Sequence, residues 1–518
     1  MDQLINKKSY SLIYIVILSA YLISGLLVHD NYGVTWDEFR NKDYAQEMSK
    51  TWDKTDYNQV VGDGESHAAS RGALYLIALN KLDKFFVPVD NIYKSFKVRR
   101  LINHLFFFLS AIVFLFFVRK LFLDDRFALI SFLMYLLMPR IYAHSFYNPV
   151  DIPFLCFFTF FFISLHSLTK SITWRGLFLH ALICGIATHL RTVGEVSIMI
   201  TLLLLVIRLF KSRSYIKEIK YISFFILITS SFYILITPFL WPDIIGRFII
   251  LHNYSLYYQP VIHSILYFGE VIPSNQLPWH YTLTWISITL PSIYILAFIY
   301  SYILNLLNYR VHTKMTDIFC SLLFIFISII LVAACGFNYS KYNDWRHFYF
   351  LYPAIILLTT ITLSKITSHK LKNFIFIVFS LQFIFTTSDI ASFHPHQIAF
   401  FNRLSGGIKN AEGNFPLEYF GSSFRQSLEF IALENTDNFN IKVAFYPYPI
   451  GMDNLKALSK QMGKKFEVSS PDKADYLLSK WIFQPHIKHL DKYKPYLYKS
   501  LKIRGVTIHN IYKLKKSQ

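Results

Sequence analysis

Three carboxylate residues stand beside apolar runs of membrane length and are the side chains best suited to do chemistry. Asp37 and Glu38 close the segment GVTWDE, directly after the apolar run 10–28. Asp151 closes the segment HSFYNPVD, between two later apolar runs. A carboxylate beside hydrocarbon is costly to desolvate, so it indicates a functional site by default. Such a group can take a proton from a hydroxyl or amine that is forming a new bond, as a general base does.

Each acid also has a simpler interpretation. Adjacent residues on a helix diverge by roughly 100°, so only one of Asp37 and Glu38 can face a reaction centre while the other orients the loop. Alternatively, both cap a surface helix that starts near Arg40, where negative charge is favoured. Asp151, just before Pro153, either serves the site by supporting an acceptor or a bound metal, or caps the first turn of a helix.

Composition sets the class of protein. The 518 residues are 54% hydrophobic, 18% aromatic and only 16% charged, which predicts a polytopic membrane protein and not a soluble globule. The net charge of +20 comes largely from short connections between apolar runs and no basic motif with interleaved aromatics appears, which excludes nucleic-acid binding. The cysteines lie in apolar runs without metal-type spacing, so we expect neither a disulfide framework nor a zinc site.

Hydropathy predicts eleven membrane spans that position these acids. We expect the first to be a retained helix, because no small-residue cleavage site follows it. The predicted spans are 10–28, 101–118, 127–142, 152–168, 176–190, 193–210, 221–240, 284–306, 316–335, 348–364 and 373–388.

Lysine and arginine concentrate in the connections on the same side as the N-terminus. The positive-inside rule then places the N-terminus in the cytoplasm, and the three acids and the C-terminus on the outer side of a bacterial-type cytoplasmic membrane. The few cations in the short outer loops need a functional explanation: Arg140, Arg191, Arg247, Lys341 and Arg346.

The chain divides into a membrane body, residues 1–388, and a tail, residues 389–518. In the body, the outer loop 29–100 contains helically spaced apolar residues over 68–86, which predict an amphipathic helix along the membrane surface. In the tail, strands are predicted at 441–448, 474–478 and on both sides of Gly505 within 496–512, with a helix at 453–462. We therefore expect a small extracytoplasmic α/β domain.

These features together resemble the GT-C glycosyltransferases, in particular the bacterial branch related to protein O-mannosyltransferases and aminoarabinose transferases. The resemblance spans residues 30 to about 425. It rests on the Asp-Glu pair after the first helix, the acid before the fourth, and the segments HSFYNP (144–149), LPWHY (277–281), WRHFYFLYP (345–353), HPHQ (394–397), FN (401–402) and EYFG (418–421). Members often have tyrosine where His396 stands, and Asp-Tyr-Trp-Gly where this chain has EYFG.

The resemblance implies a membrane glycosyltransferase of the cell envelope with a GT-C fold and an active site on the periplasmic face. It implies a polyprenyl-phosphate sugar as donor, a glycan, lipid or protein as acceptor, and Asp37 as the base. Metal dependence varies in such enzymes, so we predict no metal ligands and no required cofactor, and leave a divalent metal open. The chain has no Gly-rich phosphate loop, which argues for a lipid-linked donor over a nucleotide sugar.

A departing lipid phosphate needs fixed positive charge, and the planar fork of arginine suits phosphate oxygens. Arg346 with His347 is the first candidate, then Arg191 and Arg140; each could instead be an interfacial anchor. His144 and Asn148 complete the predicted substrate-binding set, whereas His280 and His394 are weaker candidates.

Two other functions fit a membrane protein of this size. A transporter or flippase of lipid-linked substrates should show internal repeats and ionisable groups near the bilayer midplane. Here no repeat is evident, and the notable charges gather at outer helix ends. A non-catalytic scaffold would not need acids at both positions. The transferase interpretation is therefore preferred.

Overall fold

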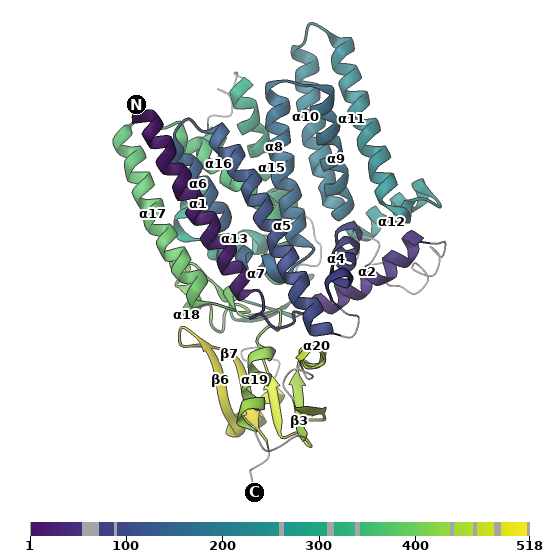
Figure 1. The fold of residues 1–518 in the computed structure, drawn as a ribbon, viewed down its shortest axis with the longest axis vertical. Coiled ribbons are helices and arrows are strands. Elements are labelled where there is room, and N and C mark those ends of the chain that lie inside the picture. The colour runs from purple at the N-terminus through teal and green to yellow at the C-terminus, as the bar shows by residue number, and fades with distance from the viewer. Residues whose placement is uncertain are drawn as a thin grey trace.

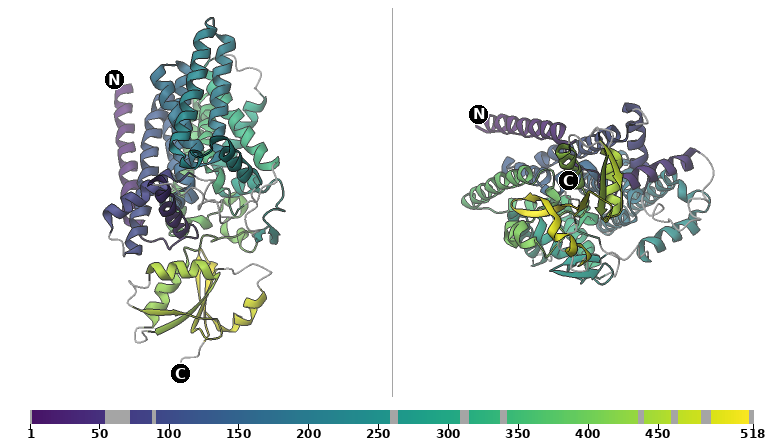
Figure 2. Two further views of the ribbon diagram at one scale, coloured as in Figure 1. Left: turned by 90° about the vertical axis from the view of Figure 1, so that its right-hand side faces the viewer. Right: turned by 90° about the horizontal axis from the view of Figure 1, so that it is seen from below.

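The computed structural model describes residues 2–53, 72–87, 91–257, 264–307, 315–336, 342–435, 440–458, 464–480 and 488–514. They form a bundle of long helices with a smaller α/β unit at one end, and the first helix begins at the opposite end (Figure 1). Figure 2 shows this unit as a separate layer beyond the ends of the helices. The predicted fold class, a helical membrane body followed by an α/β tail, is confirmed.

The helices follow the apolar runs of the sequence. Those of the body are α1 (Asp2–Val28), α2 (Glu38–Asp53), α4 (Leu74–Phe86), α5 (Ile92–Leu121), α6 (Asp125–Leu136), α7 (Pro139–Tyr147), α8 (Asp151–Lys170), α9 (Trp174–Leu190), α10 (Glu195–Lys211), α11 (Tyr215–Ile236), α12 (Ile244–Tyr257), α13 (Tyr281–Thr289), α14 (Ser292–Leu307), α15 (Met315–Gly336), α16 (Tyr352–Ser364) and α17 (His369–Ser392). Short elements join them, including the 3-10 helix η5 (Arg346–Leu351), the helix α18 (Gly407–Ala411) and the hairpin β1 (Ser264–Tyr267) and β2 (Glu270–Pro273).

The number of membrane-length helices is smaller than the eleven predicted spans. Across the described ranges, eight helices are long and apolar enough to cross a membrane, or nine if one bent pair is a single span. That pair is α6 and α7, which meet at 53° where Pro139 starts a new helix within the predicted span 127–142. The span 284–306 is divided between α13 and α14 at Pro291, and α9 has only 17 residues. Hydropathy windows average over such breaks.

The predicted amphipathic helix is present as α4, although residues 68–71 lie outside the described part of the chain. Leu76 and Leu79 are buried, whereas Phe85 and Phe86 are largely exposed, 80% and 62%. The buried face packs against α2 and α5. This packing holds α2, which begins at Glu38 of the Asp-Glu pair.

The C-terminal α/β unit, residues 424–514, is built on a five-stranded mixed sheet of order β4-β3-β5-β7-β6. Central β3 is parallel to β4 and β5, whereas β7 is antiparallel to β5 and β6. The predicted hairpin around Gly505 is the β6–β7 turn. The elements are α19 (Phe424–Glu434), β3 (Asn440–Tyr446), α20 (Tyr448–Leu458), β4 (Lys465–Val468), β5 (Tyr476–Ser479), β6 (Leu497–Ile503) and β7 (Val506–Lys513).

Candidate active site

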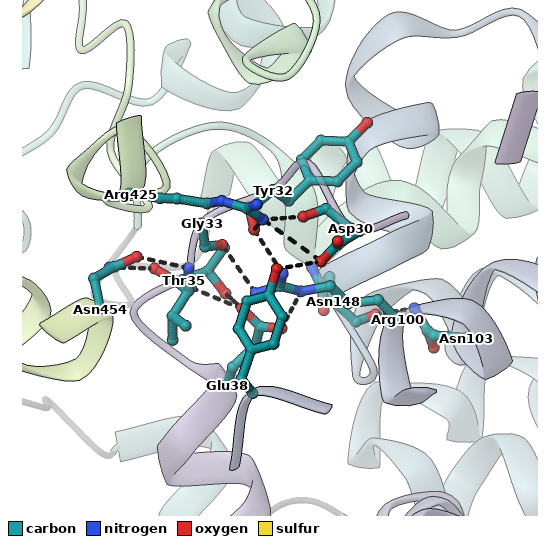
Figure 3. Close-up of polar contacts among 12 residues, drawn as sticks. Asp30, Tyr32, Gly33, Thr35, Glu38, Arg100, Asn103, Asn148, Arg425 and Asn454 are labelled. Atoms are coloured by element: carbon teal, nitrogen blue, oxygen red, sulfur yellow. Dashed lines mark hydrogen bonds and ion pairs between the residues drawn. The ribbon is translucent and has the colours of Figure 1, made fainter. Parts of the chain in front are cut away.

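The segment 33–38 leads into α2 as a capped helix start. The backbone N–H of Thr35 donates to Glu38 Oε2 at 2.7 Å, the reciprocal contact of a capping box. Glu38 is only 5% exposed, and its two oxygens also accept hydrogen bonds from Arg100 Nε and Nη2 at 2.8 and 2.9 Å. Glu38 therefore matches the capping alternative and anchors the segment to α5, as Figure 3 shows.

Asp37 lies beside a guanidinium group from a distant segment. Arg346 Nη1, at the start of η5, donates to Asp37 Oδ2 at 2.8 Å and lies 3.8 Å from Asp151 Oδ2. Arg191, which follows α9, forms an ion pair with Asp151. The structure thus brings Asp37, Asp151, Arg191 and Arg346 together from four parts of the chain; we refer to these four residues as the acid–arginine cluster.

Asp151 is held in place by a neighbouring amide. Asn148 Oδ1 accepts the backbone N–H of Asp151 at 2.9 Å, so Asn148 caps the first turn of α8. Asn148 Nδ2 donates to Asp151 Oδ2 at 2.7 Å. The cap is therefore Asn148 and not Asp151, and the Asp151 carboxylate contacts arginine.

Arg140 occupies a different environment from the other predicted arginines. It is fully buried, and its Nη1 donates to Asp344 Oδ2 at 2.9 Å, with both side chains 0% exposed. Tyr349 and Tyr419 hydroxyls donate to the same oxygen, each at 2.9 Å. Burial raises the pKa of Asp344, but the charge of Arg140, the nearby His144 and the hydrogen bonds from Trp345 N and Arg140 together outweigh burial, so the pKa of this carboxyl is lowered. Arg140 therefore neutralises a buried acid.

The predicted histidines differ in their contacts, and those of His144 join the site. His144 bridges the two arginine–aspartate groups, with Nδ1 2.9 Å from Asn148 Nδ2 and Nε2 3.5 Å from the Tyr419 hydroxyl. Elsewhere, the ring of His347 packs on Tyr342, His280 contacts the Tyr267 hydroxyl, and His394 contacts Asn31. Lys341 lies outside the described residues, and Arg247 donates to Phe239 O.

Sequence reasoning missed three residues that shape this region. Arg100 carries the Glu38 contact and also donates to Tyr32 O and Gly33 O, at 2.6 and 3.0 Å. Asp344 receives Arg140, and Asn454 contacts the segment 33–38 from the C-terminal unit. The only sequence signal was the adjacent pair Arg99-Arg100 directly before the second apolar run.

Both carboxylates of the acid–arginine cluster contact cations of the chain itself. Asp37 and Asp151 each contact a guanidinium group, which satisfies their negative charge. Over the ranges that the structure describes, no group of three or more His, Cys, Asp or Glu residues is placed to hold a metal.

Comparison with known proteins identifies the fold. No protein-family model and no curated protein sequence matches the chain. Among solved structures, ArnT from Cupriavidus metallidurans bound to undecaprenyl phosphate is similar over 98% of both chains, with 12% identity and a TM-score of 0.50. Its apo form gives a TM-score of 0.49 with 12% identity, over 99% of this chain and 100% of that one.

An oligosaccharyltransferase from Archaeoglobus fulgidus, in complex with Zn and sulfate, is a more remote match. It gives a TM-score of 0.37 with 10% identity, over 79% of this chain and 59% of that one. The ArnT similarity confirms the GT-C fold predicted from the sequence.

Proposed function

We propose that this GT-C-fold membrane protein transfers a sugar from a polyprenyl-phosphate donor to an acceptor at the outer face of the cytoplasmic membrane. The observation that carries the proposal is the acid–arginine cluster. In it, one partly exposed carboxylate, Asp37, directly contacts a guanidinium group that can bind phosphate. A base and an anion-binding group in contact are what transfer from a lipid phosphate requires.

In the proposed step, an acceptor hydroxyl or amine attacks the anomeric carbon of the sugar and Asp37 takes its proton. The new bond to carbon forms as the bond from carbon to the phosphate oxygen breaks. The electron pair of the broken bond stays on that oxygen, so free polyprenyl phosphate leaves. Positioned general bases contribute about 10²–10⁴ in rate.

Arg346 is the proposed partner of the phosphate. Its Nε has no hydrogen-bond partner among the described residues, and its guanidinium lies 4.8 Å from the ring centre of Phe420. In the resting state, Nη1 is bound to Asp37. A phosphate that engages Arg346 would compete for this group and release Asp37 to act as base.

Arg191 and Asp151 are proposed to complete the site. Arg191 is the second cation of the cluster, with a side chain 20% exposed, and Asp151 holds it in place through their ion pair. Asn148 positions Asp151, and His144 contacts Asn148 in turn. Glu38 and Arg140 are assigned positioning roles, because both are buried in fixed ion pairs.

The ArnT structure supports the donor class. That protein was crystallised with undecaprenyl phosphate, the kind of lipid phosphate that would be the leaving group here. The proposed topology keeps the sequence-based orientation, with a cytoplasmic N-terminus and residues 389–518 as an outer domain. The cluster lies near the end of the bundle that carries the C-terminal unit, since Phe420 contacts both Arg346 and the segment 33–38.

A reconstitution assay tests the function. Purified full-length protein is given a synthetic polyprenyl-phosphate sugar with candidate glycan, lipid and protein acceptors, and free polyprenyl phosphate is quantified. A transferase releases it in equal amount to glycosylated acceptor. Movement of intact donor across vesicle membranes without release would instead identify a transporter, and neither signal with any acceptor class would contradict the proposal.

A further inference from the structure

We propose that Asn454, in α20 of the C-terminal unit, is a positioning residue that holds the segment carrying Asp37. The catalytic part of this inference rests on the proposed function. The Asn454 side chain is fully buried. Its Oδ1 accepts a hydrogen bond from Val34 N and its Nδ2 donates to Val34 O, each at 2.8 Å (Figure 3). One side chain therefore binds both backbone polar groups of a residue three positions before Asp37.

A second backbone contact joins the same segments. Trp36 N donates to Phe420 O at 2.9 Å, and Asn454 Nδ2 lies 3.3 Å from Gly421 O. The ring of Phe420 in turn packs on the guanidinium of Arg346. The residues that lead into the C-terminal unit thus touch both members of the Asp37–Arg346 pair or their direct neighbours.

Two glycines make this close approach possible. A Cβ atom at Gly33 would collide with the carbonyl oxygen of Ser422. Gly421 has a φ of 81°, a conformation that side chains with a Cβ rarely adopt, and a Cβ there would collide with Ile450 of α20. Backbone from the two parts of the chain therefore meets directly, which larger residues would prevent.

The Asp37 segment is held from two sides. From the membrane body, Arg100 binds Tyr32 O, Gly33 O and the Glu38 carboxylate. From the C-terminal unit, Asn454 binds Val34. Without the second contact, both backbone polar groups of Val34 lose their side-chain partner, and the backbone that leads to Asp37 is less restrained. A displacement of about 1 Å at a reacting group can reduce turnover by about 10²-fold, so the C-terminal unit is a necessary part of the site.

The test compares N454L with a matched control in the full-length protein. The control, N435L, removes an asparagine whose amide contacts Ile431 O and the Tyr476 hydroxyl among the described residues, both within the C-terminal unit. For N454L we expect faster hydrogen exchange at the amides of Val34 and Trp36, and a 10- to 100-fold lower kcat. The KM for donor should change less than threefold, because Arg346 remains. N435L should leave the hydrogen exchange at Val34 and Trp36, the kcat and the KM for donor unchanged.

A second variant provides rescue and guards against misfolding of N454L. In N454D the carboxylate faces the carbonyls of Val34, Gly421 and Ile450, but in acid its protonated form again offers one donor and one acceptor. The kcat of N454D and its hydrogen-exchange rates at Val34 and Trp36 are each divided by the wild-type value at the same pH. Both ratios should therefore approach one as pH falls. If neither the kcat ratio nor the exchange ratio changes with pH, the inference is overturned.

Hydrogen exchange keeps this inference separate from the proposed function. Unchanged exchange at Val34 and Trp36 in N454L overturns the positioning role whatever the activity. If the exchange rises but wild-type protein does not turn over the lipid-linked donor, only the proposed function fails. If wild type is active and the kcat of N454L stays within twofold of it, the link exists but does not position Asp37, and the inference is wrong.

Discussion

Two arginine–aspartate pairs of nearly equal length behave differently because of their surroundings. Arg346 and Asp37 are 2.8 Å apart with side chains 14% and 20% exposed. Arg140 and Asp344 are 2.9 Å apart and both 0% exposed. A pair that a substrate can reach can exchange partners, whereas a sealed pair cannot. The N···O distances alone do not distinguish the two pairs.

The sealed pair is also the more completely surrounded. Arg140 lies 5.1 Å from the ring centre of Trp285 and 4.8 Å from that of Phe401, and it donates to Phe400 O. Asp344 takes hydrogen bonds from two tyrosine hydroxyls besides Arg140. We interpret this network as the support on which the reachable pair is built, joined to it through His144 and Asn148.

The largest expected effect on stability is that of Asp344→Asn. Asn tolerates the left-handed backbone of this residue, whose φ is 68°, so the change removes the charge without adding strain. Arg140 is then left as an unpaired buried charge, which costs about 3–5 kcal/mol. A lower thermal unfolding midpoint in detergent measures the loss.

The matched control for this change removes both charges. In Arg140→Met with Asp344→Asn no buried charge remains, so much of the lost stability should return. If Asp344→Asn alone were as stable as wild type, the sealed pair would not be a support. The comparison between the two pairs would then fail.

A smaller effect, on donor use alone, is expected for Arg346→Lys. Lysine keeps the charge but lacks the planar fork that binds two phosphate oxygens. We expect the KM for donor to rise about tenfold, equal to about 1.4 kcal/mol, with little change in unfolding temperature. The control is Arg126→Lys, because Arg126 forms an ion pair with Asp124 and neither residue belongs to the acid–arginine cluster. An unchanged KM would remove Arg346 from phosphate binding.

The smallest expected effect is a pH dependence centred on His509, which contacts Ser423 where the C-terminal unit meets the body. Burial, then the nearby His396 and Lys480, lowers its pKa to about 3. Because free histidine titrates near 6.5, the unfolded chain binds a proton that the folded chain does not. Stability should therefore fall as pH drops below about 6.5, by at most about 1.4 kcal/mol per pH unit.

His509→Gln should flatten this acid slope, since glutamine can still contact Ser423 but has no proton to bind in this range. The slope is measured as the unfolding midpoint between pH 7 and pH 5. His369→Gln, at an exposed position, is the control. An unaltered slope in His509→Gln would assign the pH dependence to other groups.

The sequence predicted what depends on local pattern. Apolar runs predicted the helices, alternation predicted β3, a short apolar run predicted β5, and the topology predicted Asp37 and Asp151 on the same face of the membrane. Partners set by tertiary contact were not predictable. Arg100 looked like a flanking cation of the second apolar run, yet it lies within α5 and binds Glu38.

The exposure of individual arginine side chains also could not be predicted from hydropathy. Arg140 and Arg346 both appeared as cations at outer helix ends, and only the fold seals one and leaves the other reachable. The same holds for Asn454. Its sequence neighbourhood gave no signal, because its partner Val34 is 420 residues away in the chain.

The central claim is that Asp37 accepts the proton of the acceptor. The most direct test is the rate of polyprenyl phosphate release by Asp37→Asn at saturating donor and acceptor, with the exposed helix-capping change Asp243→Asn as control. Asparagine keeps the size and caps about as well but cannot take the proton, so we expect a loss on the order of 10²-fold or more in a folded protein. Release within a few-fold of wild type would contradict the account.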